Sequence, residues 1–219
     1  MKIANLLDIH THHPHRPEAL LSLPPQEALS GCDTPFSLEL HPWHLTSTPQ
    51  GGDSPEGKEL CRAFKGGNLC RSFEEAAQTL QGHPWLLAIG ECGLDNQCGV
   101  PLVVQVEAFR LALRTARQMH LPVILHGVGY WAELTQCCQE EGMLASNCPP
   151  LIVHGFRKGP QLAQQLLDAG FHLSLGEKFN PEVARIVPTS RLWFETDESQ
   201  EDIEKIRKRI LELREVTGT

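Results

Sequence analysis

Five short apolar runs that end on acidic or imidazole side chains constrain the fold of this chain more than any other feature. The six side chains at their ends are His10 and His12, Glu91, His126, His154 and Asp197. Short apolar runs rich in β-forming residues are typical of buried strands, and parallel strands bring their carboxyl ends to one edge of a sheet. We therefore expect these six side chains to lie together on one rim.

Strand-like runs alternate with helical patterns over most of the chain. The sequence predicts strands at 3–9, 18–23, 36–41, 86–91, 122–126, 150–154, 171–175 and 191–196, and helices at 73–80, 103–120, 130–142, 159–169, 181–186 and 201–216. Ser72 and Glu75 have the spacing of a capping box at the start of the first helix. Residues 45–72 form the longest stretch predicted to be irregular.

This order predicts an α/β fold, namely a compact TIM-like (β/α)8 barrel formed by a single domain, 1–219. The chain has 219 residues, whereas such a barrel usually needs about 250. We therefore expect reduced early helices, with at least one of them missing or reduced to a turn.

Composition and charge narrow the class of protein. No apolar run approaches the roughly 20 residues that span a membrane, and the start of the chain resembles no export signal. We expect a cytoplasmic protein with no membrane contact and no obligate protein partner, in which the eight cysteines are free thiols. The net charge of −8 disfavours a broad basic face for nucleic acid, although metal ions can supply local positive charge.

The six side chains at the strand ends indicate a metal site. Neutral imidazoles and carboxylates suit Zn²⁺, Mn²⁺ and similar ions, and a central glutamate can bridge two ions about 3.5–4 Å apart. A lone histidine on an apolar run is more often a hydrogen-bonded core residue than a ligand. A carboxylate at the end of a buried run, in contrast, costs free energy unless it is paired or liganded. Glu91 and Asp197 therefore favour the binuclear metal site of a hydrolase.

Several short motifs in the chain resemble those of the TatD family of metal-dependent hydrolases. They are Asp8-Ile9-His10-Thr11-His12 (D-x-H-x-H), His41-Pro42, Gly90-Glu91-Cys92-Gly93-Leu94-Asp95 (G-E-x-G-L-D), Pro122 to His126 (P-V-I-x-H), His154-Gly155-Phe156 and Glu195-Thr196-Asp197. They occur in the family's order and span residues 8–197.

The resemblance implies a compact TIM-like barrel that hydrolyses its substrate with two divalent metal ions, Zn²⁺, Mg²⁺ or Mn²⁺. It implies one ion on His10, His12 and Asp197, a second on His126 and His154, and Glu91 as the bridge. Glu91 and Asp197 would be catalytic, with Asp197 taking the proton of the attacking water, and His41 would lie beside the substrate. The family's best-known activity is DNA hydrolysis, including 3′-to-5′ exonuclease action, and some members act on ester-linked aminoacyl-tRNA.

One departure from the family pattern affects phosphate recognition. The family commonly carries H-x-R after the ligand in its P-V-I-x-H block, whereas this chain has Val128 there. Arg157 with Lys158, or Lys178, could replace that cation, although loop charges are usually solvated. We expect Trp43 to be buried beside the mouth of the barrel, and stacking on a base or sugar is the alternative.

Three functions are compatible with these patterns. The leading hypothesis is a TatD-type deoxyribonuclease or phosphodiesterase, whose partner is DNA or another phosphodiester substrate. The second is a metal-dependent amidohydrolase or esterase, which the missing arginine and the acidic charge favour. The third is a non-enzymatic binding protein, which the retention of all six costly side chains disfavours.

Overall fold

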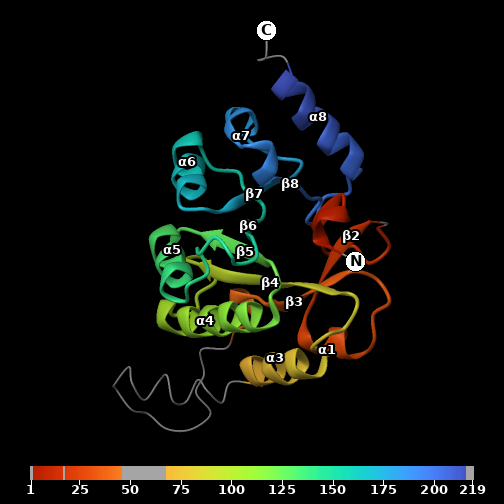
Figure 1. Ribbon diagram of the computed structural model, residues 1–219, viewed down its shortest axis with the longest axis vertical. Coiled ribbons are helices and arrows are strands. Elements are labelled where there is room, and N and C mark those ends of the chain that lie inside the picture. Colours follow the sequence, from red (N-terminus) through yellow and green to blue (C-terminus); the bar gives the residue numbers. More distant parts are fainter. Residues whose placement is uncertain (1, 17, 46–67, 216–219) are drawn as a thin grey trace.

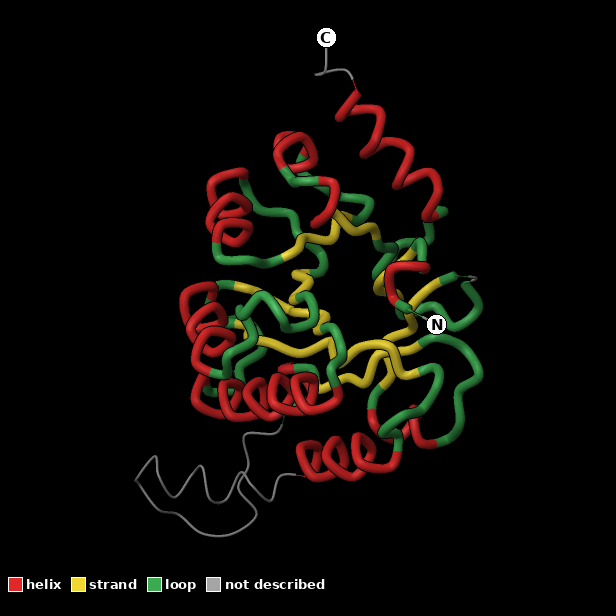
Figure 2. Tube along the Cα trace, in the orientation of Figure 1, coloured by secondary structure: helices red, strands yellow, loops and turns green. Residues whose placement is uncertain are grey.

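The computed structural model describes residues 2–16, 18–45 and 68–215. Its strands form one parallel sheet in the order in which they occur along the chain. They are β1 (Asp8–Thr11), β2 (Ala19–Leu23), β3 (Phe36–Leu40), β4 (Leu86–Asp95), β5 (Val123–Val128), β6 (Leu151–Val153), β7 (His172–Leu175) and β8 (Leu192–Phe194). Figure 2 shows these strands as a yellow ring with the helices outside it.

The ring closes where the segment after β8 meets β1. Thr11 and Asp197 form an isolated parallel bridge, and Asp197 N–H donates to the His10 carbonyl at 2.9 Å. The buried carboxylate of Asp8 accepts from Thr196 Oγ1 at 2.6 Å and from Thr196 N–H at 3.1 Å. These contacts confirm the TIM-like (β/α)8 barrel, and they place the segment that bears Asp197 beside His10.

Most helices follow the strands as predicted (Figure 1). They are α1 (Pro25–Leu29), α3 (Asn68–Thr79), α4 (Leu102–Met119), α5 (Trp131–Glu140), α6 (Pro160–Asp168), α7 (Pro181–Ile186) and α8 (Ile203–Glu215). The described residues between β1 and β2 contain no helix, and α1 has only five residues. The prediction of reduced early helices is therefore confirmed.

The structure corrects the first predicted strand and the first predicted helix. Residues Ile3–Asn5 form a 3₁₀ turn rather than strand, because the buried Ile3 and Leu6 are three residues apart, which is the 3₁₀ period. Helix α3 begins at Asn68, so Ser72 lies inside it and is not its N-cap. The apolar face already starts at Cys70, one turn before Phe73. Of the stretch predicted to be irregular, 68–72 is therefore helical, and 46–67 lies outside the described residues.

The fourth strand also differs, and this difference bears on the site. We predicted it to end at Glu91, where the apolar run stops, whereas β4 continues to Asp95. Residues Gly93 and Asp95 pair with His126 and Val128 of β5. The predicted strand was ended where polar residues begin, but every residue of β4 is buried, and the strand pairs with β5 again from Cys92 to Asp95.

Two apolar clusters support the barrel. The larger one packs the outer faces of the strands against the helices. The smaller one joins residues of β1, β2, β4, β5 and β6 with the turn before β1, namely Ile9, Leu20, Leu87, Ala88, Ile124, Ile152, Ile3 and Leu6. Because this cluster fills the barrel below the strand ends, the polar side chains lie above an apolar floor.

Two further predictions concern cysteines and membranes. The seven cysteines within the described residues are free, as predicted, and Cys61 lies outside those residues. No helix in the described part of the chain is long and apolar enough to cross a membrane.

Candidate metal centre

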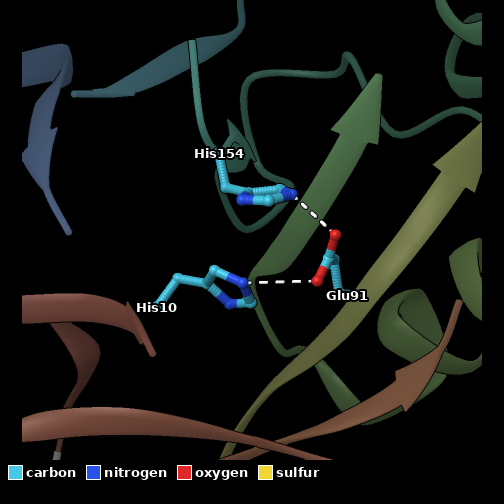
Figure 3. A group of neighbouring side chains, drawn as sticks. All are labelled: His10, Glu91 and His154. Carbon is cyan, nitrogen blue, oxygen red and sulfur yellow. Dashed lines mark ion pairs between the residues drawn. The ribbon is translucent and has the colours of Figure 1, made fainter. Parts of the chain in front are cut away.

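The structure brings all six predicted side chains together at the carboxyl end of the barrel. His10 belongs to β1, Glu91 to β4 and His126 to β5. His12, His154 and Asp197 lie in the segments that follow β1, β6 and β8. Figure 3 shows His10 and His154 side by side, each directed to a different oxygen of the Glu91 carboxylate.

The carboxylate of Glu91 divides its two oxygens between two groups of imidazoles. Its Oε2 lies 3.3 Å from His10 Nε2 and 3.5 Å from His12 Nε2. Its Oε1 lies 2.7 Å from both His126 Nδ1 and His154 Nε2. Each oxygen therefore faces one of the two ligand sets that the resemblance implies, which is the arrangement that a bridging carboxylate requires.

Asp197 completes the group around Oε2. Its Oδ1 lies 3.8 Å from His10 Nε2 and 3.8 Å from His12 Nε2. The backbone of Asp197 has a φ of +55°, a left-handed conformation that non-glycine residues seldom adopt and that is enriched at functional sites. His10, His12 and Asp197 form one of the groups of closely spaced potential ligand atoms, and His10, Glu91 and His154 form another.

The donor atoms fit divalent cations. His10 is fully buried, and neither of its ring nitrogens makes a hydrogen bond within the described residues, which costs free energy unless another partner binds them. Imidazole nitrogens and carboxylate oxygens together are the ligands of Zn²⁺ and of similar first-row ions.

The electrostatics of the cluster also suit positive charge. Burial opposes ionisation of Glu91, but the charge of His154 and the close imidazoles of His10, His12 and His126 hold its pKa well below the ordinary value. The hydrogen bond to Glu91 raises the pKa of His12, although burial opposes this. Glu91 therefore stays ionised and attracts cations to the imidazoles around it.

The comparison with known families agrees with this geometry. Residues 32–215 match the model described as TatD related DNase. The chain belongs to this family. The matched range includes Glu91, His126, His154 and Asp197.

Curated relatives of this TatD-family chain include named hydrolases. YabD of Bacillus subtilis (strain 168), an uncharacterized metal-dependent hydrolase, is 32% identical over 126 residues, which cover 54% of this chain and 48% of YabD. The 3'-5' ssDNA/RNA exonuclease TatD of Citrobacter koseri is 27% identical over 133 residues, which cover 57% of this chain and 50% of that protein. The chain thus spans about half the length of the curated relatives it matches.

Solved structures share the fold. YJJV, a TatD homolog from Escherichia coli K12, superposes with a TM-score of 0.60 at 16% identity and covers 96% of both chains. A TatD family hydrolase from Entamoeba histolytica gives a TM-score of 0.62 at 16% identity, covering 88% of this chain and 73% of its own. At this identity, the likeness establishes the barrel alone.

Sequence reasoning assigned no role to Asp95, which the structure places directly behind the metal centre. Its Oδ2 accepts from His126 Nε2 at 2.8 Å and from Trp43 Nε1 at 2.7 Å. Burial opposes ionisation of Asp95, but the hydrogen bonds from Trp43 and His126 lower its pKa below the ordinary value. Because the carboxylate binds the Nε2 proton of His126, Nδ1 is left free to bind a cation.

Strand periodicity was the signal that could have found Asp95. Residues 91, 93 and 95 are two apart, so they share one face of a strand that continues beyond Glu91. Gln105 of α4 fixes this end of the strand, because its side-chain oxygen accepts from Asp95 N–H at 2.7 Å and its nitrogen donates to the Asp95 carbonyl at 2.9 Å.

Gly93 allows β4 to approach β5 closely enough to build the site. A Cβ at this position, where φ is +152°, would lie 1.9 Å from the carbonyl oxygen of His126. No side chain fits into that space, so glycine is required for the contact that brings Glu91 and Asp95 beside His126.

His41, which we expected beside the substrate, lies in direct contact with two of the predicted metal ligands. Its Nε2 lies 3.0 Å from Glu91 Oε1 and 3.3 Å from His126 Nδ1. Trp43, expected to be buried, is 55% exposed, because its indole N–H is directed to Asp95 while its ring faces solvent. Both residues line a cavity of about 480 Å³ that contains Glu91, His126, His154 and Asp197.

Proposed function

We propose that this protein is a metal-dependent hydrolase that cleaves phosphodiester bonds of single-stranded nucleic acid, in the manner of a TatD-type nuclease. The observation that carries the proposal is the division of Glu91 between two sets of imidazoles, with Asp197 completing one of them. The relatives named as metal-dependent hydrolases and as 3'-5' ssDNA/RNA exonucleases support this reaction and this substrate class.

In this proposal, His10, His12 and Asp197 would hold one divalent cation, His126 and His154 would hold a second, and Glu91 would contribute one oxygen to each set. Bound divalent cations lower the pKa of a coordinated water toward roughly 7 and neutralise charge on a phosphodiester. Zn²⁺, Mg²⁺ and Mn²⁺ are the candidates.

The protein's own groups hold and move the protons. Asp197 Oδ1 faces the centre beside His10 and His12, so this carboxylate is placed to accept a proton from the attacking water. His41 lines the same cavity and would lie beside the substrate, with its ring held by Glu91 and by Trp43 N–H, which donates to Nδ1 at 3.2 Å. A cytoplasmic location stays a prediction.

The amidohydrolase or esterase alternative would use the same carboxylates and imidazoles. The relatives that carry the exonuclease name favour the phosphodiester substrate over it. An amide or neutral ester needs no cation beyond the metal centre, whereas a phosphodiester benefits from one.

The test is hydrolysis of a 5′-labelled single-stranded oligonucleotide and of bis-p-nitrophenyl phosphate by metal-stripped protein after addition of Mg²⁺, Mn²⁺ or Zn²⁺. We expect cleavage that requires metal and is lost in Asp197→Asn, while the exposed control Asp33→Asn keeps it. A product ladder that shortens from the 3′ end would identify exonuclease action. Metal-loaded protein that cleaves neither substrate would refute the proposal, and turnover in Asp197→Asn equal to wild type would refute the role of that residue.

A further inference from the structure

Three cavities open around the metal centre, and two residues line all of them. Their volumes are about 230, 360 and 480 Å³, and the residues common to all three are Asp197 and Arg157. Arg157 follows His154 by three residues, in the loop between β6 and α6. Whichever of these cavities a substrate enters, its path passes this guanidinium.

The largest of these three cavities is lined by several acidic side chains and by Arg157. This cavity is lined by five carboxylates, those of Glu39, Glu91, Asp95, Asp197 and Glu198, and Arg157 is the one lysine or arginine among its lining residues. A phosphodiester that entered it would be repelled by the carboxylates that do not bind metal. A permanent positive charge beside the metal centre offsets that repulsion.

The contacts of Arg157 leave most of its donors available. Its Nη2 lies 3.4 Å from Asp197 Oδ2, and its side chain is 54% exposed. Within the described residues the guanidinium makes no other hydrogen bond. Because Asp197 Oδ1 faces His10 and His12, the guanidinium lies on the outer side of that carboxylate, one ion-pair distance from the centre.

We propose that Arg157 is the phosphate-binding cation of this site and determines its selectivity for anionic substrates. The proposal rests on the proposed function, in that it names the group that recognises the phosphate next to the metal centre. A guanidinium presents parallel N–H donors that match two oxygens of one phosphate group. The unused donors of Arg157 can bind the substrate while Nη2 keeps Asp197 in place.

Val128 offers a way to test this assignment by relocation of the charge. It lines the cavity of about 230 Å³ together with Arg157, His126 and Asp197, but comes from β5. An arginine at position 128 would enter the same cavity from another wall. If the charge is what matters, Val128→Arg should compensate for the loss of Arg157, whereas a role confined to orienting Asp197 would not be restored.

The experiment measures binding of inorganic phosphate and of thymidine 5′-monophosphate to metal-loaded protein by calorimetry, beside the metal content of each variant. Removal of one charge-assisted hydrogen-bonding partner should weaken binding about 10- to 100-fold in Arg157→Ala. Arg157→Lys should fall between, because it keeps the charge and loses the fork. Val128→Arg combined with Arg157→Ala should regain at least half of the lost affinity on a logarithmic scale. Arg185→Ala on α7, outside the three cavities, removes one charge as the matched control.

Each result has a distinct meaning. Unchanged phosphate affinity in Arg157→Ala would overturn the assignment. Loss of metal in Arg157→Ala that Val128→Arg does not restore would also overturn it, because this result shows that Arg157 acts by holding Asp197. Wild-type protein that binds phosphate through Arg157 but cleaves no phosphodiester would refute the proposed function and leave this inference standing. Protein that takes up no metal would overturn both.

Discussion

Replacing Asp95 by asparagine tests whether the metal centre depends on the carboxylate behind His126. Both oxygens of Asp95 are hydrogen-bond acceptors: Oδ2 for His126 Nε2 and Trp43 Nε1, and Oδ1 for Gln97 N–H at 2.7 Å. Asparagine has one oxygen. Either orientation of its amide therefore directs an NH₂ group against at least one of these N–H donors.

The structure gives the magnitude of this effect. Asp95 is 3% exposed, so water cannot replace the lost acceptor. One unsatisfied buried donor costs about 1–3 kcal/mol, which is the expected loss in free energy of unfolding of the metal-free protein. Loss of the carboxylate also lowers the basicity of His126 Nδ1, and such changes behind a ligand typically cost about 10- to 100-fold in metal affinity.

The assay is competition for Zn²⁺ between the protein and a chromophoric chelator, with urea unfolding of the metal-free variants. Asp33→Asn removes an exposed carboxylate and should behave as wild type in both measurements. Trp43→Phe removes one donor to Asp95 but keeps the carboxylate, so its metal affinity should change much less than that of Asp95→Asn. If Asp95→Asn binds Zn²⁺ within about twofold of wild type, the reasoning that Asp95 prepares His126 for metal is wrong.

Three further predictions concern residues around the barrel. Trp43→Ala should raise KM for single-stranded DNA about 5- to 100-fold, and Trp43→Phe much less, because the exposed ring is placed to stack on a base; an unchanged KM in Trp43→Ala would contradict this. Gly93→Ala should lower the free energy of unfolding by about 2–6 kcal/mol through steric and backbone strain, whereas Gly99→Ala, where the new Cβ meets no atom within 4 Å, should lose only the backbone part. Burial lowers the pKa of His172 below 6.5, so the stability it contributes is present above that pH and is lost on acidification. Urea unfolding should therefore show a larger loss between about pH 7.5 and about pH 5.5 in wild type than in His172→Gln, which can still accept the Trp193 N–H bond; equal losses would exclude His172 as a source.

The barrel could be predicted because its strands are apolar on both faces over most of their length. Ile124, Leu125 and Ile152 are fully buried, and such runs stand out from a sequence of helices and loops. The prediction of strand ends was wrong where polar residues are buried, because it assumed that a strand stops where its apolar residues stop. In β4 the strand continues through Glu91 to Asp95, since its polar groups are paired inside the mouth, so a reading of apolar residues stopped four residues too early.

Loop residues were harder to assign than strand residues for a related reason. A charge in a loop is usually solvated, so nothing in the sequence favoured Arg157 over Lys158 or Lys178 as the cation that binds phosphate. The distinction is spatial, because Arg157 lines all three cavities at the metal centre, whereas each lysine lines one. The fold places Arg157, in the loop after β6, next to Asp197, in the segment after β8, although the two residues are far apart in the sequence.

Which imidazoles each oxygen of Glu91 faces depends on the closure of the barrel between β8 and β1 and on irregular pairing of the strands. Strand register shifts between Asp8 and Thr11 on β1, and between Ile89 and Cys92 on β4, which are the positions that carry His10 and Glu91. Such irregularities occur next to active sites because they redirect side chains that simple alternation would direct elsewhere. A sequence can therefore indicate which side chains reach the rim, but not which oxygen of Glu91 each imidazole faces. That choice follows from the register shift of β4 around Glu91 and from the bridge between Thr11 and Asp197, which places Asp197 beside His10.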